Sequence, residues 1–152
     1  MSEISETEIQ KDDRKVDRIY IEKEDKEKYD RLQETNFFQG KTNSQLFLFA
    51  ICYALKNGGG KHPIKNRLGY FRLESTREEE IMLLKTLAMY DSGNVDILTD
   101  DKQLYSIAEE YANFGIKILS ETYESTQFGS FYKIIEKDIN ELLSEIESGK
   151  ED

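Results

Sequence analysis

The residues best suited to bind an anion lie in a stretch of the chain that has no acidic side chain. No Asp or Glu occurs between Glu34 and Glu74, and residues 35–73 contain six Lys or Arg, so this window carries +6. The whole chain carries −10, which leaves −16 for the remainder (−10 − 6 = −16). A protein this acidic repels polyanions in general. The acid-free window is therefore where an anionic partner meets no like-charge repulsion.

Within this window, a glycine-rich basic loop leads into a short extended segment. Backbone N–H groups of consecutive glycines can face an anion, while basic side chains add charge and a tyrosine ring can stack on a base. The candidate anion- or nucleic-acid-binding residues are Lys56, Gly58, Gly59, Gly60, Lys61, His62, Lys65, Arg67, Tyr70 and Arg72. The spacing fits neither a Walker A loop nor the GxGxxG dinucleotide motif. The alternative is a solvated loop whose bases pair with the protein's own acids, with Tyr70 in the core.

The other reactive side chains do not form a catalytic motif. His62 is the only histidine and has no metal-ligand partners at suitable spacing. Cys52 is the only cysteine and lies in the apolar run 46–55, which predicts a buried small hydrophobe rather than a nucleophile. Four aspartates lack calcium-loop order and are expected to cap helices or form turns: Asp91, Asp96, Asp100 and Asp101. We therefore expect no catalytic residue, no metal and no cofactor.

Composition and length favour a fold that is mainly α with short β-strands (α+β), in a single compact domain. The chain has 152 residues, 38% hydrophobic and 11% aromatic, which is enough to form a core. We expect a disordered acidic arm over 1–15, a domain over 16–147 and a disordered tail over 148–152. The apolar run 46–55 is about half the ~20 residues that cross a bilayer, and the acidic charge balance also predicts no membrane contact. A polar N-terminus without a signal core and a single cysteine fit a cytoplasmic location.

Apolar periodicity and capping residues predict four to five helices after an N-terminal strand. The domain begins with a strand-helix-helix unit over 16–57, continues as a basic loop and extended segment over 58–73, and ends in a helical part over 74–147. Thr42, Asn43 or Ser44 is expected to cap the second helix, and Thr76 with Glu79 fits a capping box. The predicted strands or extended segments are 16–22, 68–73 and 95–98, and the predicted helices are 25–35, 45–56, 77–90, 102–121 and 131–147.

The 16–57 unit resembles the ribbon-helix-helix plan, in which two chains pair their strands and pack their helices together. This resemblance implies a homodimer. In that family the outward strand residues read the DNA major groove. The corresponding residues here are Arg18, Tyr20 and Glu22, which are nearly neutral together and argue against readout by the strand.

A second resemblance covers residues 17–121. QLFLFAICYALKNGGGKHPI, a helix ending near Asp91-Ser92-Gly93, and then IAEEYANFGIKIL are similar to a small prokaryotic family encoded beside DNA phosphorothioation (Dnd) gene clusters. The family pattern includes a Glu-Tyr-Ala-Asn-x-Gly-like segment, here residues 110–115. The resemblance implies a non-catalytic accessory protein of a DNA modification or restriction (defence) system, with DNA and other defence-system proteins as partners.

The alternative function is a protein-interaction adaptor without DNA contact. In this interpretation the acidic helices predicted over 77–90 and 102–121 bind a basic partner. No pair of chemically competent groups is joined by a motif, so an enzymatic function is the least supported interpretation.

Overall fold

The computed structural model describes residues 16–126 and 130–151, and these residues form five α-helices and two short strands. The elements are β1 (Arg18–Glu22), α2 (Lys26–Gln33), α3 (Asn43–Lys56), β2 (Arg67–Arg72), α4 (Glu78–Ser92), α5 (Asp101–Ser125) and α6 (Ser130–Glu151). The predicted mainly helical fold with an N-terminal strand-helix unit is confirmed. The arm predicted over 1–15 lies outside the described residues.

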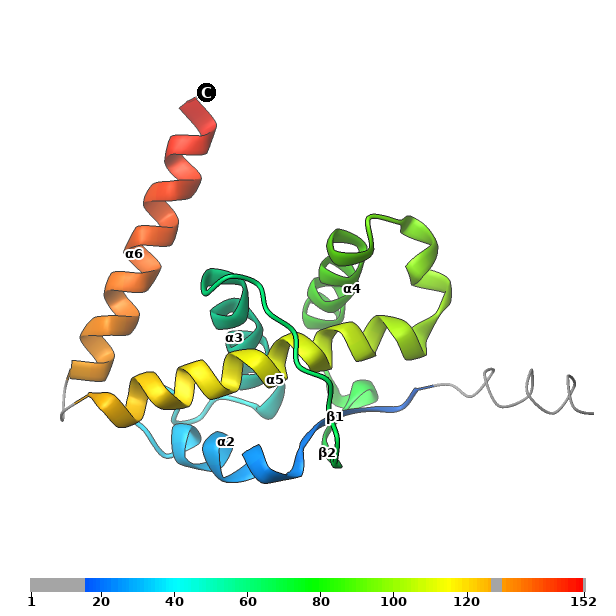
Figure 1. Cartoon of the computed structure of the whole chain (residues 1–152), viewed down its shortest axis with the longest axis horizontal. Helices are drawn as coiled ribbons and strands as arrows, with labels where there is room; N and C mark the ends of the chain where they lie inside the picture. The colour runs from blue at the N-terminus through cyan, green and yellow to red at the C-terminus, as the bar shows by residue number, and fades with distance from the viewer. Residues whose placement is uncertain (1–15, 127–129, 152) are drawn as a thin grey trace, which may run out of the picture.

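The long helix α5 runs through the centre of the molecule, with α3 and α4 on one side of it and α2 on another (Figure 1). Its closest neighbour is α3, and the two backbones approach at Gly115. A Cβ atom at this position would lie 1.7 Å from the carbonyl oxygen of Ala50. Because only glycine permits this approach, the α3–α5 crossing depends on Gly115. The largest fully buried side chains lie around this crossing and beneath the strands, among them Phe47, Leu46, Ile116, Leu119 and Ile19.

Local sequence accounts for the ends of α3. The Thr42 hydroxyl accepts a hydrogen bond from the Gln45 backbone N–H (3.2 Å), and the Gln45 side chain accepts one from the Thr42 N–H (2.9 Å). This capping box satisfies two N–H groups that the first turn leaves free. At the other end, Gly58 has φ of 102°, the left-handed conformation that glycine adopts without strain. The predicted helix is confirmed, although it starts at Asn43.

The two strands form an antiparallel ribbon within one chain. Arg18 lies opposite Arg72, Tyr20 opposite Gly69 and Glu22 opposite Arg67, with an irregularity between Ile19 and Tyr20. Ile19 and Ile21 are buried, as the predicted alternation requires. The ribbon-helix-helix plan pairs strands from two chains, whereas β1 here finds its partner strand in its own chain.

The segment before α4 and the segment after it differ from the predictions. The expected capping box at Thr76 is wrong, because the Thr76 hydroxyl instead donates to the Arg72 carbonyl (2.7 Å) and Arg77 occupies the cap position without a side-chain bond. The predicted extended segment 95–98 is a 3₁₀ helix, Val95–Thr99. The Asn94 side chain accepts from the Asp96 N–H (3.0 Å) and so starts a helical turn.

The last two helices are longer than predicted. Helix α5 continues to Ser125, into the predicted linker 122–130, and α6 continues to Glu151, through most of the predicted tail. Tyr123 on the added turn of α5 packs against Phe131 of α6, with ring centroids 5.2 Å apart. This contact gives the extra turn a packing partner that the sequence pattern alone does not reveal.

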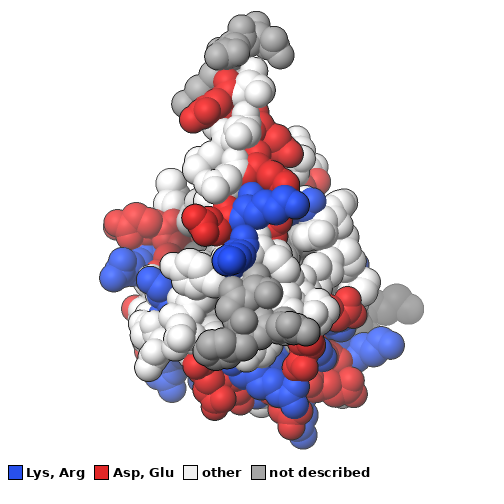
Figure 2. All heavy atoms as spheres, turned by 90° about the vertical axis from the view of Figure 1, so that its left-hand side faces the viewer, with Lys and Arg blue, Asp and Glu red and all other residues white. Residues whose placement is uncertain are grey.

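Helix α6 projects away from the rest of the molecule (Figure 1), and the space-filling view shows it as a narrow extension (Figure 2). Phe131 and Ile135 are buried, and the Tyr53 hydroxyl on α3 donates to Asp138 (2.6 Å). Farther along, the apolar side chains Leu143 and Ile146 are about half exposed (52% and 50%). Among the described residues, no helix is both long enough and apolar enough to cross a membrane.

Candidate functional site

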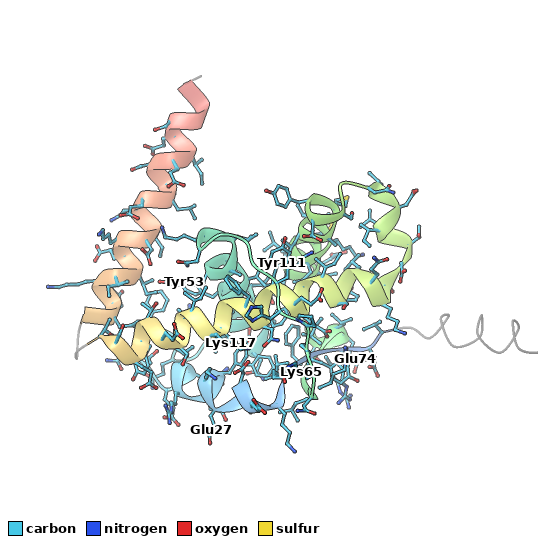
Figure 3. All side chains as sticks on the ribbon, viewed as in Figure 1. Glu27, Tyr53, Lys65, Glu74, Tyr111 and Lys117 are labelled. Atoms are coloured by element: carbon cyan, nitrogen blue, oxygen red, sulfur yellow. The ribbon has the colours of Figure 1, made fainter. Side chains whose placement is uncertain are left out.

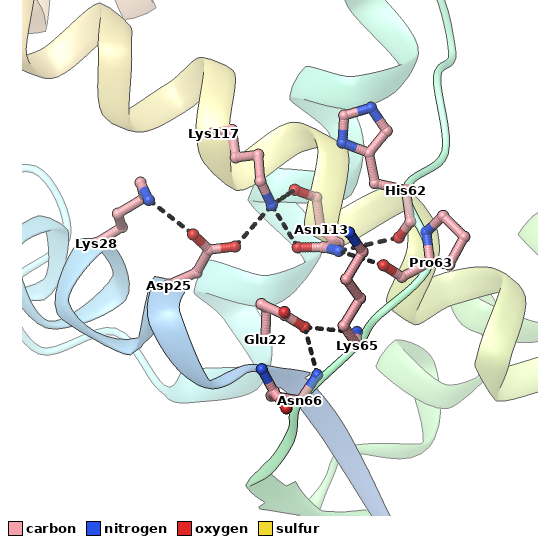
Figure 4. Close-up of polar contacts among 9 residues, drawn as sticks. All are labelled: Glu22, Asp25, Lys28, His62, Pro63, Lys65, Asn66, Asn113 and Lys117. Carbon is pink, nitrogen blue, oxygen red and sulfur yellow. Dashed lines mark hydrogen bonds and ion pairs between the residues drawn. The ribbon is translucent and has the colours of Figure 1, made fainter.

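The basic segment, residues 56–72, lies against a column of polar side chains on α5. This polar column consists of Glu109, Asn113 and Lys117, spaced four residues apart on one face of the helix. The Asn113 side chain donates to the backbone carbonyls of His62 (3.0 Å) and Pro63 (3.2 Å), as Figure 4 shows. The His62 backbone N–H donates to the Glu110 carbonyl (3.0 Å). The middle of the loop is therefore fixed to α5.

Lys117 joins the polar column to the start of α2. Its ammonium donates to Asn113 Oδ1 (2.6 Å) and to the carboxylate of Asp25 (2.8 Å), and it lies between α5 and α2 (Figures 3 and 4). Asp25 is only 2% exposed and also accepts from Lys28 (2.7 Å). Asp25 occupies the cap position of α2, but its side chain makes no capping bond. It acts instead as the counter-ion of two lysines.

Glu22 binds the backbone at the point where the basic segment enters β2. Its carboxylate accepts from the N–H groups of Lys65 (2.9 Å) and Asn66 (3.1 Å), and the residue is 8% exposed. The prediction that Glu22 points outward beside Arg18 and Tyr20 is therefore wrong. The cause is local, because these two N–H groups lie in a loop and need an acceptor.

Glu109 is the buried partner of Arg67. One guanidinium nitrogen of Arg67 lies 3.1 Å from Glu109 Oε1, and Glu109 Oε2 accepts from the Tyr20 backbone N–H (2.8 Å). Burial raises the pKa of Glu109, while the Tyr20 N–H and Arg67 act in the opposite direction. The Arg67 guanidinium also lies over the Tyr20 ring, 4.5 Å from its centroid, and its side chain stays 51% exposed.

Two lysines of the basic segment are paired with acids from distant helices. Lys61 contacts Asp91 of α4 (3.0 Å), which also accepts from the Tyr111 hydroxyl (2.5 Å). Burial by itself would raise the pKa of Asp91, but the bonds from Tyr111 and Lys61 outweigh it and the pKa is lowered. Burial and the nearby Asp91 raise the pKa of Tyr111 to about 12. Lys56 lies 3.3 Å from Glu141 of α6. Lys56 and Lys61 therefore fit the alternative in which bases of the loop pair with the protein's own acids.

Several other candidate residues have structural roles. Tyr70 is 8% exposed and packs on Tyr29 with ring centroids 4.7 Å apart, so its ring is in the core rather than available for stacking on a base. Gly59 donates its N–H to the Ala54 carbonyl (2.8 Å) in the end of α3. A Cβ at Gly60 would come within 2.8 Å of the Phe114 ring. His62 is exposed, and its ring packs edge-on with that of Phe114, with ring centroids 5.1 Å apart.

Three arginines gather on the outer face of the β1–β2 ribbon. We define this ribbon face as Arg18, Tyr20, Arg67 and Arg72. Gly69 makes room for Arg18, because a Cβ there would lie 3.1 Å from the Arg18 side chain. Arg18 and Arg72 pair with Asp17 (3.9 Å) and Glu74 (3.3 Å), and these acids are 83% and 75% exposed. Ion pairs this exposed contribute little stability, so an anion can replace the acid partner of either arginine. Lys65 is also exposed and has no ion pair within the described parts of the chain.

Cys52 corrects another expectation, because it is exposed on α3 rather than buried. It faces a groove beside α6, where partial desolvation raises the pKa of its thiol. Asp100 caps α5 as predicted, accepting from the Gln103 N–H (3.2 Å). In the described part of the chain, no three His, Cys, Asp or Glu side chains are arranged to hold a metal ion.

Sequence reasoning missed the polar column that lies against the basic segment. Glu109 and Lys117 lie on the predicted helix 102–121, at positions i and i+8 with Asn113 between them. Polar residues recurring every fourth position beside an apolar stripe are the available signal, since they predict a polar line next to the core.

The family model for DNA sulphur modification system-associated protein 4 matches residues 18–148. The chain belongs to this family. The resemblance to Dnd-associated proteins is confirmed, and the match covers most of α6, which the resemblance over 17–121 did not include. Membership associates the chain with the DNA sulphur modification system and so with its other proteins. No curated protein and no solved structure matched the chain.

Proposed function

We propose that this chain is a non-catalytic accessory protein of a DNA phosphorothioate modification or restriction system, and that it contacts DNA or a protein–DNA complex through the basic segment. The observation that carries the proposal is the ribbon face, where Arg67 and Arg72 of the basic segment are joined by Arg18 and the Tyr20 ring from β1. Family membership supplies the system in which this contact would operate.

The chemistry of the ribbon face suits a nucleic-acid backbone. A two-stranded ribbon is narrow enough for the major groove, and arginine binds phosphate with two parallel N–H bonds. The burial of Glu22 removes the acid that made the outward residues of β1 nearly neutral. Each phosphate contact contributes a slope of about −0.9 in log K against log salt, so three arginines predict a slope of about −3. The acidic remainder of the chain keeps the affinity modest.

The test is an electrophoretic mobility shift with duplex DNA, with and without phosphorothioate linkages, at about 50 and about 200 mM salt. The variant Arg18→Ala/Arg72→Ala removes two arginines whose acid partners are exposed, so the fold should persist. Its matched control, Lys102→Ala/Lys133→Ala, removes the same charge from exposed positions on α5 and α6.

We expect the arginine variant to weaken the shift at least about tenfold at low salt and to reduce the salt slope by about 2, while the control changes little. Equal weakening of the shift by both variants would mean that net charge causes the effect, rather than contact through the ribbon face. A shift unchanged by the arginine substitutions would refute contact through the ribbon face.

The second candidate is an adaptor that binds a basic protein and makes no DNA contact. The pairing of Lys56, Lys61 and Arg67 with the protein's own acids favours it. Absence of any shift at low salt would make this candidate the leading one.

The homodimer remains a prediction. Neither candidate function requires it, because β1 pairs with a strand of its own chain. Sedimentation equilibrium measures the oligomeric state and tests this prediction.

A further inference from the structure

An open groove of about 480 Å³ with a mainly apolar lining lies between helices α3 and α6. Cys52 and Leu55 contribute from α3, and Ile135, Ile139 and Leu142 from α6. Ile135 is fully buried, whereas Leu55, Ile139 and Leu142 are 41%, 44% and 44% exposed. The groove therefore has a closed end near the base of α6 and a wall of apolar side chains that solvent reaches.

The exposed stripe on α6 continues beyond the part of the helix that α3 covers. Ile135, Ile139, Leu142 and Ile146 recur at helical spacing on one face. Helix α3 ends at Lys56, which pairs with Glu141. Ile146, four residues beyond Leu142, lies outside the groove lining. A contiguous apolar surface of this kind on a water-exposed helix is typical of an interaction site.

The charges beside the stripe indicate what kind of partner fits. Residues 138–149 of α6 contain four acids and no Lys or Arg: Asp138, Glu141, Glu145 and Glu147. Figure 2 shows acidic side chains among uncharged ones on the outer side of the projecting part of α6, with basic side chains nearer its base. A second copy of this chain would bring the same acidic helix into contact, and like charges would oppose that pairing. A partner with basic flanks gains attraction instead.

We propose that the α3–α6 groove binds an amphipathic helix with a basic polar face, supplied by a protein other than this chain. The bound helix places apolar residues at i, i+3 or i+4, and i+7 into the groove, over Leu55, Ile139 and Leu142. Its Lys or Arg residues lie opposite Glu145 and Glu147. This interaction needs no DNA contact, so it stands independently of the ribbon face.

The chain provides its own probe for the groove, because Cys52 is the only cysteine and lines it. The full chain is mixed with a synthetic helical peptide of Leu and Lys that has one apolar face, and the alkylation rate of Cys52 is followed. A peptide of the same composition, scrambled to remove the apolar face, and a Leu/Glu peptide serve as controls. We expect the Leu/Lys helix to slow alkylation, and neither control peptide to do so.

Two matched variants decide whether the groove is the binding site. Leu142→Asp places a charge in the groove, and Leu83→Asp makes the same change at an exposed position on α4 (57% exposed), with circular dichroism checking the fold of both. We expect Leu142→Asp to weaken peptide binding roughly tenfold, equivalent to 1.4 kcal/mol, and Leu83→Asp to have little effect.

Three outcomes would overturn the proposal. The first is equal weakening by both variants, and the second is equal protection of Cys52 by the scrambled or the Leu/Glu peptide. The third is a chain that dimerises without peptide, protects Cys52 in the dimer and becomes monomeric on Leu142→Asp. That result would make a second copy the occupant.

Discussion

At the scale of residues, the basic segment is held by acids that come from outside the acid-free window. Glu22 accepts two backbone N–H groups, Asp25 accepts from two lysines, and Glu109 accepts from Arg67 and the Tyr20 N–H. A buried carboxylate is tolerated only when such donors replace its water. The same acids that make the protein repel polyanions thus determine where its basic side chains can point.

Asp91 provides a test of this arrangement at a single residue. Asp91→Asn should lower the free energy of unfolding by about 1 kcal/mol at neutral pH, because it weakens the bonds from Tyr111 and Lys61. The pKa of Asp91 is lowered in the folded state, so the charged form contributes stability above the unfolded-state pKa of 3.8. That contribution is lost as pH falls through the lower, folded-state pKa.

Urea unfolding of both proteins across this pH range measures the effect. The difference between wild type and Asp91→Asn should be constant near neutral pH and should close at the acid end. A difference that stays the same at every pH would show that the charge on Asp91 is not what stabilises the fold.

At the scale of elements, the molecule is organised around one helix. Helix α5 contacts α3, α4, α2 and β1, so it carries one side of the core and also presents the polar column to the basic segment. Because both faces belong to one helix, the core packing and the polar column cannot move independently. A shift of α5 against α3 would also move the residues that hold the loop.

Gly115 is where this linkage can be tested. Gly115→Ala places a Cβ against the Ala50 carbonyl, which flexible side-chain movement cannot relieve, so we expect a loss of about 1–3 kcal/mol or more in the free energy of unfolding. Gly149→Ala on α6 is the matched control. Its Cβ meets nothing within 4 Å, and alanine should favour the helix by about 0.5–1 kcal/mol.

Thermal and urea unfolding of the two variants give the comparison. We expect the free energy of unfolding to fall for Gly115→Ala and to rise for Gly149→Ala, although the chemical change is the same. A neutral Gly115→Ala would mean that the helices do not cross as closely as the structure indicates.

At the scale of the whole molecule, the chain consists of a body built around α5 and a projecting helix attached at its base. Helix α6 is held by Phe131, Ile135 and the Tyr53–Asp138 hydrogen bond, and farther out its apolar residues are largely exposed. A helix with so few buried contacts is expected to open separately from the core. The ribbon face lies on the body, whereas the proposed docking groove depends on the position of α6.

Tyr53→Phe tests this division. The substitution removes the hydroxyl that donates to Asp138 and should weaken the docking of α6 by about 1.5–3 kcal/mol. Hydrogen exchange should then accelerate along α6 while the amides of α3 and α5 keep their protection. Equal acceleration throughout the chain would mean that α6 unfolds together with the body.

Helix periodicity and capping residues were sufficient to predict most helices, because both depend on neighbours a few residues apart. The alternation of Ile19 and Ile21 likewise predicted the buried side of β1. The extension of α5 was missed because its last turn is supported by Tyr123 against Phe131, a contact with the next helix. Cys52 was misplaced for a related reason, since its apolar neighbours in sequence do not reveal that α6 leaves that side of α3 uncovered.

The sequence by itself determined the local helices, the acid-free window and the family to which the chain belongs, since each of these is written in nearby residues or in the linear pattern. Only the tertiary structure decided which of the window's basic residues remain available. Glu22 and the Lys65 N–H are 43 residues apart, and Lys117 and Asp25 are 92 residues apart. An ion pair depends on distance in space, and that distance is set by how the helices pack rather than by their order along the chain.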